Sequence, residues 1–317
     1  MTRKCPGASR ALINDRVGGA SPAAPAATAS RSRADSNAAR VSETISSKMV
    51  MTVFDGILIG AAAVVILHGQ WNGWYALPHS ASTTNRSPAE GFFIFAGLLL
   101  LGLLGQGLVT LLQSEYPVTE LEVHTLGLLF SLPLQIVLLL TVNRFFPTLP
   151  VPNRISRREA IRLGVRRFLP VWLVVVGAAT ISSLMRQVFA GEPSDPIGHA
   201  SLAMLIESSG WVVPTFVLMV TLAVPWLEEV AFRGLLQPAL TRLLGSARWG
   251  VVMTAGLFAA AHLGAVQWDG LPGLFVLGLG LGILRAQTGR IESAVVVHVL
   301  FNLLNIVLTW LSTSASV

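Results

Sequence analysis

The sequence predicts an all-α membrane protein, a polytopic helix bundle with about eight transmembrane helices. Hydrophobic residues make up 53% of the 317 residues, charged residues only 12%, and the mean hydropathy is +0.66. These values lie well outside the usual range of soluble domains. After Met51 the apolar residues form runs whose lengths are close to the about 20 residues that a helix needs to cross a bilayer. The single cysteine, Cys5, excludes a disulfide framework and a cysteine-based zinc site.

The first part of the chain, residues 1–50, differs from the rest. It is rich in Ala, Ser, Arg and Pro, and residues 1–48 hold eight Lys/Arg against three Asp/Glu. Because it has few large apolar residues, we expect a disordered basic tail. Met49 or Met51 is an alternative start, in which case the tail is not part of the mature protein. The tail carries nearly all of the net charge of +6, so no nucleic-acid partner is expected.

Residues 51–317 are predicted to form an integral membrane domain, and its short or Gly-rich candidate spans leave seven or nine crossings open. One candidate is too long for a single straight crossing, and Pro225 predicts a kink in it. The expected spans are 52–69, 92–112, 121–143, 168–186, 211–241, 250–265, 272–287 and 293–312.

The connection 144–167 predicts the orientation of the chain, because short loops rich in Lys and Arg face the cytoplasm. Against the single acid Glu159 it carries Arg144, Arg154, Arg157, Arg158, Arg162, Arg166 and Arg167. We therefore expect this loop to be cytoplasmic, in a bacterial-type inner membrane.

The stretch GLGLGILRAQTG has a glycine pattern that resembles a dinucleotide-binding loop. It lies in an apolar segment with no preceding strand, so this reading is not favoured. Gly278 and Gly282 instead share one helix face, where small residues allow close helix packing.

Three of the apolar segments carry polar side chains that are costly in lipid. They read LEEVAFRG (227–234), FAAAH (258–262) and HVLFN (298–302). A charged residue at the centre of a span costs about 2.5 to 3.5 kcal/mol, and such residues usually face a protein interior or a wet cavity. The segments therefore predict a shared polar site.

In the first segment, Glu229 and Arg233 are four residues apart with the acid first. On a helix they share a face, and we expect them to form a structural ion pair that supports the site. Glu228 is rotated by about 100° from Glu229 and lacks that partner. A carboxylate without a full counter-charge in a poorly solvated place suits a general base or acid.

His298 and Asn302 are also four residues apart and project from one helix face. With Glu228 and His262 they supply the groups for amide hydrolysis, namely a base, a second group that holds the water, and oxyanion donors. A metal site is the alternative, because Glu228, His262 and His298 form a two-His, one-carboxylate ligand set. No H-E-x-x-H motif is present, so the usual helix-borne zinc protease geometry is absent.

The motifs E-E-x-x-x-R, F-x-x-x-H and H-x-x-x-N, in this order on successive membrane helices, resemble the CPBP family of intramembrane proteases. This family includes the type II CAAX prenyl endopeptidases and bacterial Abi-type proteins. The similarity covers roughly residues 211–312, the expected motif-bearing core. The resemblance implies that Glu228 and His262 activate the water, while His298 and Asn302 stabilise the oxyanion.

Asn302 bears on whether a metal such as zinc takes part. An amide is a poor zinc ligand, whereas its NH₂ group is a good oxyanion donor. Its placement one turn from His298 favours a donor pair and water activation without a tightly bound metal. The zinc alternative, with Glu228, His262 and His298 as ligands, remains.

The leading function is thus an intramembrane endopeptidase that cleaves a membrane-associated peptide or lipidated protein, with prenylation of the substrate left open. Its partners are the lipid bilayer and this substrate, and the sequence indicates no oligomeric state. A proton-coupled transporter is a second reading, but repeated halves with broken helices are absent from the sequence. A non-catalytic family scaffold is a third, and the presence of all four proposed catalytic side chains argues against it.

Overall fold

The fold is given by a computed structural model, which describes residues 53–77, 86–113, 118–145, 154–190 and 200–314. The expected basic tail, residues 1–50, lies outside these described residues. Regular structure in the described part is helical. Seven of its helices are long and apolar enough to cross a membrane, which confirms an integral, multi-pass helix bundle.

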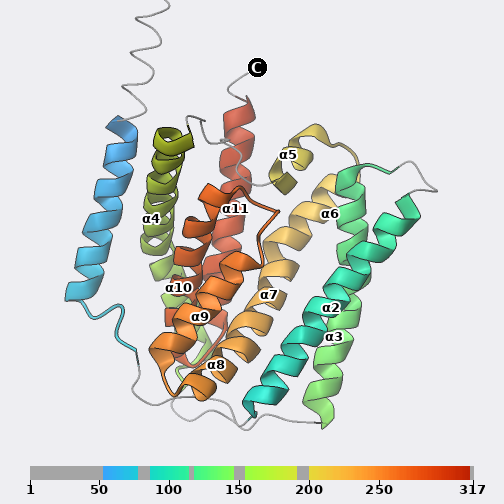
Figure 1. Cartoon of the computed structure of the whole chain (residues 1–317), viewed down its shortest axis with the longest axis horizontal. Coiled ribbons are helices and arrows are strands. Elements are labelled where there is room, and N and C mark those ends of the chain that lie inside the picture. The colour runs from blue at the N-terminus through green and yellow to red at the C-terminus, as the bar shows by residue number, and fades with distance from the viewer. Residues whose placement is uncertain (1–52, 78–85, 114–117, 146–153, 191–199, 315–317) are drawn as a thin grey trace, which may run out of the picture. The chain divides into compact units, whose positions relative to one another are not determined.

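Figure 1 shows the helices in their order along the chain. The first helix, drawn in blue, covers Val53–Trp71. It is followed by α2 (Pro88–Gln113), α3 (Glu120–Phe145), α4 (Arg157–Ala190) and the short α5 (Ala200–Glu207). Then come α6 (Val212–Leu218), η1 (Met219–Ala223), α7 (Val224–Glu228), η2 (Glu229–Leu236), α8 (Gln237–Leu244), α9 (Ala247–Ala260), η3 (Trp268–Gly270), α10 (Leu271–Thr288) and α11 (Glu292–Ser314).

The starts of α2, α3 and α4 are fixed by the same local device. In each, the hydroxyl of a Ser or Thr accepts a hydrogen bond from the backbone N–H of a Glu three residues later. The carboxylate of that Glu accepts a hydrogen bond from the backbone N–H of the Ser or Thr. This reciprocal pattern is a capping box, which satisfies two backbone donors at a helix start. The pairs are Ser87 with Glu90, Thr119 with Glu122 and Ser156 with Glu159.

The expected span 211–241 is a composite helix, Val212–Leu244, whose α-helical winding is interrupted by two π-helical segments. The segments η1 and η2 are π-helical, a winding in which a carbonyl bonds to the N–H five residues on. The N–H of Val224 donates to the Met219 carbonyl in this way, and the N–H of Gln237 donates to the Phe232 carbonyl. Pro225 lies in the first turn of α7, between these two segments. The irregularity expected at Pro225 thus takes the form of wider turns on either side of it.

The expected connection 144–167 is helical from Arg157 on, because α4 continues beyond its apolar part into the basic residues before it. The expected span 250–265 is too short in the structure for a full crossing. The helix α9 has only 14 residues, about 21 Å at 1.5 Å per residue, which is shorter than the about 30 Å of a hydrocarbon core. Beyond it the chain makes tight turns, with Gly264 at a φ of +87°. The expected eight spans are therefore, within the described residues, seven long helices and one short apolar helix.

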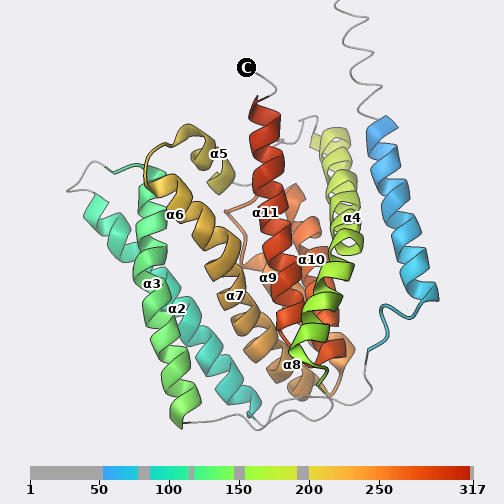
Figure 2. The same cartoon turned by 180° about the vertical axis from the view of Figure 1, so that it is seen from behind.

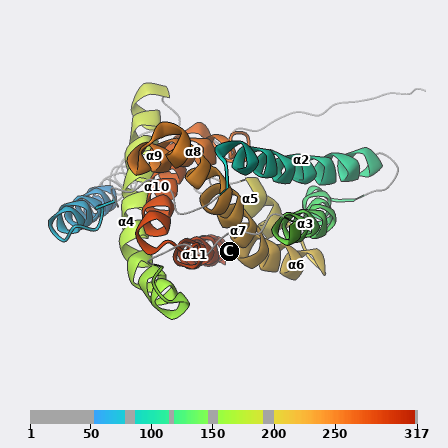
Figure 3. The same cartoon turned by 90° about the horizontal axis from the view of Figure 1, so that it is seen from below.

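The composite helix and α10 form the interior of the bundle. In the membrane-spanning part of the composite helix 39% of the residues are buried, and in that of α10 the share is 44%. In the first helix, which flanks α4, only 11% are buried (Figures 2 and 3). A Cβ at Gly278 would lie 3.0 Å from Ala255, and one at Gly282 would lie 3.0 Å from Val251. The close packing expected at these two glycines is confirmed, with α9 as the neighbour.

Candidate active site

The pair Glu229 and Arg233 lies at the centre of the bundle. Arg233 Nη1 donates to Glu229 Oε1 at 2.9 Å, and both side chains are 0% exposed. Arg233 Nη2 donates to the carbonyl of Gly278 on α10 at 3.3 Å. Its guanidinium group also lies 4.5 Å from the ring centre of Phe258 on α9. The pair therefore connects three helices.

Glu229 has a second partner on α11. The same oxygen, Oε1, lies 2.9 Å from His298 Nδ1, and the other ring nitrogen, Nε2, lies 3.6 Å from Glu228 Oε2. An ionised carboxylate only accepts hydrogen bonds, so Nδ1 carries a proton in its contact with Glu229. His298 is thus held between two consecutive carboxylates of the composite helix.

Glu228 and Glu229 have different surroundings although they are neighbours in the chain. The side chain of Glu228 is 27% exposed, whereas that of Glu229 is fully buried. The rotation of successive residues around the helix separates them, as expected from the sequence. Glu228 is the carboxylate with access to the cavity described below.

His262 lies just after α9, in the turn that leads to α10. Its Nδ1 is 2.8 Å from the carbonyl oxygen of Phe258, so Nδ1 donates and Nε2 is the acceptor in the neutral ring. The Phe258 ring contacts His262 at 4.8 Å and His298 at 5.8 Å between ring centres. Farther along the turn, Asp269 forms an ion pair with Arg186 of α4 at 3.3 Å.

Asn302 is held by the irregular backbone of the composite helix. In the π-helical segment η1 the backbone N–H of Val224 donates to the carbonyl of Met219, five residues earlier. The next donor in that pattern would be residue 225, and proline has no N–H. Asn302 Nδ2 supplies the donor instead, at 2.8 Å from the Val220 carbonyl oxygen. One of its two amide hydrogens is used there, and the second is available for another acceptor.

The four candidate catalytic residues line one cavity with a volume of about 470 Å³. This volume lies within the range of about 300 to 1,000 Å³ that is usual for ligand pockets. The composite helix, the turn after α9, and α11 form one side of the cavity, while α2 and α3 form the other. The residues concerned are Glu228, His262, His298 and Asn302.

The α2 and α3 side of the cavity also carries polar groups that the sequence did not point to. Gln106 Nε2 lies 2.7 Å from His124 Nδ1, and Gln135 Nε2 donates to the Leu98 carbonyl at 2.8 Å. The sequence assigned His124 no role, yet it lines the cavity. The signal that could have indicated these residues is that they are isolated polar side chains inside two strongly apolar spans.

The alternative zinc ligands, Glu228, His262 and His298, share the cavity but do not converge. In the described part of the chain, no three His, Cys, Asp or Glu side chains are placed so that they could hold a metal ion. The residues as placed do not fit a metal, and we derive no step through one.

A protein-family model matches the part of the chain that carries this site. Residues 210–304 match the family described as Type II CAAX prenyl endopeptidase Rce1-like. The match includes all three motifs, so the motif-bearing part of the chain is similar to the type II CAAX prenyl endopeptidases. The family resemblance of the sequence is thereby confirmed. Neither the curated proteins nor the solved structures gave a match.

Proposed function

We propose that this protein is an intramembrane endopeptidase that hydrolyses a peptide bond in a membrane-associated peptide or lipidated protein. The observation that carries the proposal is the common cavity, into which the composite helix, the turn after α9 and α11 each bring candidate groups. Membership of the matched segment in a protease family supports the same reaction class. The whole catalytic domain, 51–317, would include α2 and α3 as the opposite wall.

In the proposed reaction a water molecule lies between Glu228 and His262. The Glu228 carboxylate takes a proton as the water oxygen attacks the carbonyl carbon, while His262 Nε2 accepts a hydrogen bond from the second hydrogen, which stays on that oxygen. The proton on Glu228 then passes to the nitrogen of the scissile bond. The C–N bond breaks, and a carboxylic acid and an amine result.

The oxyanion formed by this attack would be stabilised by His298 and Asn302. Asn302 donates the amide hydrogen that Val220 does not use. His298 donates from Nε2, and since its Nδ1–H is directed to Glu229, it acts as the doubly protonated ring. Glu229 thereby orients His298, and Arg233 in turn holds Glu229.

The decisive test is cleavage of a membrane-anchored peptide by purified protein in liposomes, with Glu228→Gln as the variant. The isosteric amide cannot take a proton, so cleavage should fall by about 10²- to 10⁴-fold. Because Glu228 lies at the cavity surface, thermal stability and insertion should be unchanged. Glu120→Gln, the same change at an exposed position at the start of α3, is the matched control. Near-wild-type turnover of Glu228→Gln in folded protein would exclude this mechanism.

A further inference from the structure

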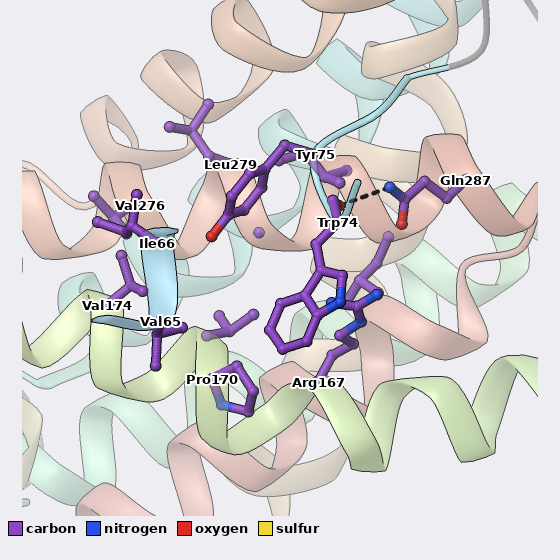
Figure 4. A pocket seen from close by; sticks show the side chains of 14 residues that line it. Val65, Ile66, Trp74, Tyr75, Arg167, Pro170, Val174, Val276, Leu279 and Gln287 are labelled. Carbon is purple, nitrogen blue, oxygen red and sulfur yellow. Dashed lines mark hydrogen bonds between the residues drawn. The ribbon is translucent and has the colours of Figure 1, made fainter. Parts of the chain in front are cut away.

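A second cavity lies away from the candidate active site, between the first helix, α4 and α10. It has a volume of about 330 Å³ (Figure 4). Its walls are mostly aliphatic, and Val65, Val174 and Val276 gather at one end. Arg167 and Gln287 lie at the other end. The cavity is therefore amphipathic along its length.

The polar end of this cavity is held together by specific bonds. Gln287 Nε2 on α10 donates to the carbonyl of Trp74 at 2.8 Å and to that of Ala76 at 2.9 Å. Trp74 N–H donates to the Gly69 carbonyl at 2.8 Å. These bonds fold the segment after the first helix against α10. The Arg167 guanidinium group then stacks on the Trp74 ring, 3.8 Å from its centre.

Among the described residues that line the cavity, Arg167 is the only one with a charged side chain. Within the described part of the chain, no carboxylate lies within ion-pair distance of it. Tyr75 also lines the cavity, where burial raises the pKa of its phenol and Arg167 opposes this rise. The phenol is therefore neutral at physiological pH and gives no counter-charge. The cavity accordingly presents an uncompensated cation.

The position of Arg167 along α4 places it at the membrane surface. This helix has 34 residues, about 50 Å, and exceeds the about 30 Å hydrocarbon core. Its arginines at 157, 158, 162, 166 and 167 occupy the first third, and the apolar stretch 168–185 follows. Arg167 is thus the last cation before the hydrocarbon, at the depth of lipid headgroups.

An apolar space of this size beside the bilayer favours one kind of occupant. Water requires two to four polar partners, which the aliphatic end does not offer. An empty space would forfeit the dispersion contacts of its walls. A hydrocarbon chain satisfies the aliphatic end, and an anion satisfies Arg167. Basic pockets between transmembrane helices bind anionic lipid headgroups for this reason.

We propose that this cavity binds one anionic phospholipid, with an acyl chain between Val65, Val174 and Val276 and its phosphate on Arg167. The site lies on a different face of α10 from the active-site cavity, because Val276, Leu279 and Ile283 line this cavity whereas Leu274 and Leu277 line the other. It does not depend on the proposed protease function. Its role is to fix the first helix against α4 and α10.

The test uses the full chain, purified in detergent and mixed with phosphatidylglycerol or phosphatidylcholine of the same acyl composition. Native mass spectrometry counts the lipids retained. Wild-type protein should retain one phosphatidylglycerol in preference to phosphatidylcholine. Arg167→Gln should weaken this preference about fivefold, the effect of about 1 kcal/mol per arginine near the surface. Arg166→Gln, the same change at an exposed neighbour outside the cavity, should leave the preference unchanged.

Two further arms separate chain binding from anion binding. Val174→Phe fills the aliphatic end and should reduce retention of both lipids alike. Excess inorganic phosphate should not displace phosphatidylglycerol, because it lacks the chain; displacement would mean an anion site and overturn the proposal. Equal behaviour of Arg167→Gln and Arg166→Gln would also overturn it. If Arg167→Gln does not fold, Arg167→Lys keeps the charge, and loss of the preference in this variant would count against the phosphate contact.

Discussion

At the scale of single residues, Glu229 serves both stability and the proposed chemistry. One oxygen, Oε1, accepts from Arg233 and from His298, each at 2.9 Å. Arg233 neutralises the buried carboxylate, while His298 is aligned by it. Changes at these three residues should therefore separate protein stability from cleavage.

Arg233→Ala should lower stability, because it leaves Glu229 as a buried carboxylate without its cation. Breaking a buried pair in this way costs about 3 to 5 kcal/mol. Expression and thermal stability in detergent should both fall. The double change Glu229→Gln with Arg233→Gln removes both charges and should recover part of the stability.

Cleavage should stay low in the double variant, since the amide at position 229 is a weaker acceptor for His298. A double variant no more stable than Arg233→Ala would contradict the ion-pair interpretation. One that recovers full cleavage would contradict the proposed alignment of His298. Circular dichroism melting and the liposome cleavage assay measure the two effects separately.

The pairing of Glu229 with Arg233 was predictable from the sequence, because both residues lie on one helix at a known spacing. The contact of Glu229 with His298 was not, since it depends on how α11 packs against the composite helix. His262 was predicted as a site residue but not its position in a turn. Hydrophobic periodicity carries no information on these contacts between helices.

At the scale of the element, η1 explains why an asparagine on α11 is bound to the composite helix. The Val220 carbonyl accepts from Asn302, whereas residue 225, the donor that the π pattern would use, is proline. In lipid an unsatisfied carbonyl costs several kcal/mol. Asn302 therefore stabilises the composite helix in addition to its proposed role as an oxyanion donor.

A double-mutant cycle distinguishes these two roles of Asn302. Asn302→Ala should reduce both thermal stability and cleavage. Pro225→Ala restores an N–H that can reach the Val220 carbonyl, so it should recover stability in the Asn302→Ala background by about 0.5 to 3 kcal/mol. Cleavage should not recover, because the oxyanion donor is still absent.

Equal stability of Asn302→Ala with and without Pro225→Ala would show that the carbonyl is satisfied in another way. Recovery of cleavage together with stability would mean that Asn302 acts only through the fold. Asn305→Ala is a suitable control, since it changes another amide of α11 that lines the same cavity.

The sequence predicted most of the long helices within a few residues, since their length and apolar content are unambiguous. The exception is α4, which begins at Arg157 and not at residue 168, because its first turns are helical but too basic to be recognised by hydropathy. It did not predict the π-helical turns, because one extra residue per turn leaves the composition of a span unchanged. It also extended α9 to residue 265. The apolar run continues through Ala261, Leu263 and Val266, although the chain there forms a turn.

At the scale of the whole membrane domain, the arginines gather at one end of the bundle. The start of α4, the end of α8, the start of α9 and the end of α10 lie together at the lower end in Figures 1 and 2. These segments carry the basic residues Arg157, Arg158, Arg162, Arg242, Arg248 and Arg285. The positive-inside rule predicts that this end faces the cytoplasm.

Cysteine labelling tests this orientation, since Cys5 is the only native cysteine and can first be replaced by serine. In intact cells, a cysteine introduced as Arg158→Cys should resist a membrane-impermeant maleimide until the membrane is permeabilised. Ser208→Cys, at the opposite end of the bundle, should react at once. The reverse pattern would invert the predicted topology.

The short helix α9 has a consequence for the solvent inside the membrane. The peptide groups of 261–270 lie in turns at the end of a helix that does not cross the hydrocarbon, and lipid cannot solvate them. Non-helical backbone at such depth is tolerated where it lines an aqueous space. Deuterium exchange in lipid nanodiscs should therefore be fast across 261–270 and slow in the adjoining core of α10. A turn as protected as α10 would mean that this region is sealed by lipid; fast exchange would locate the route by which hydrolytic water reaches His262.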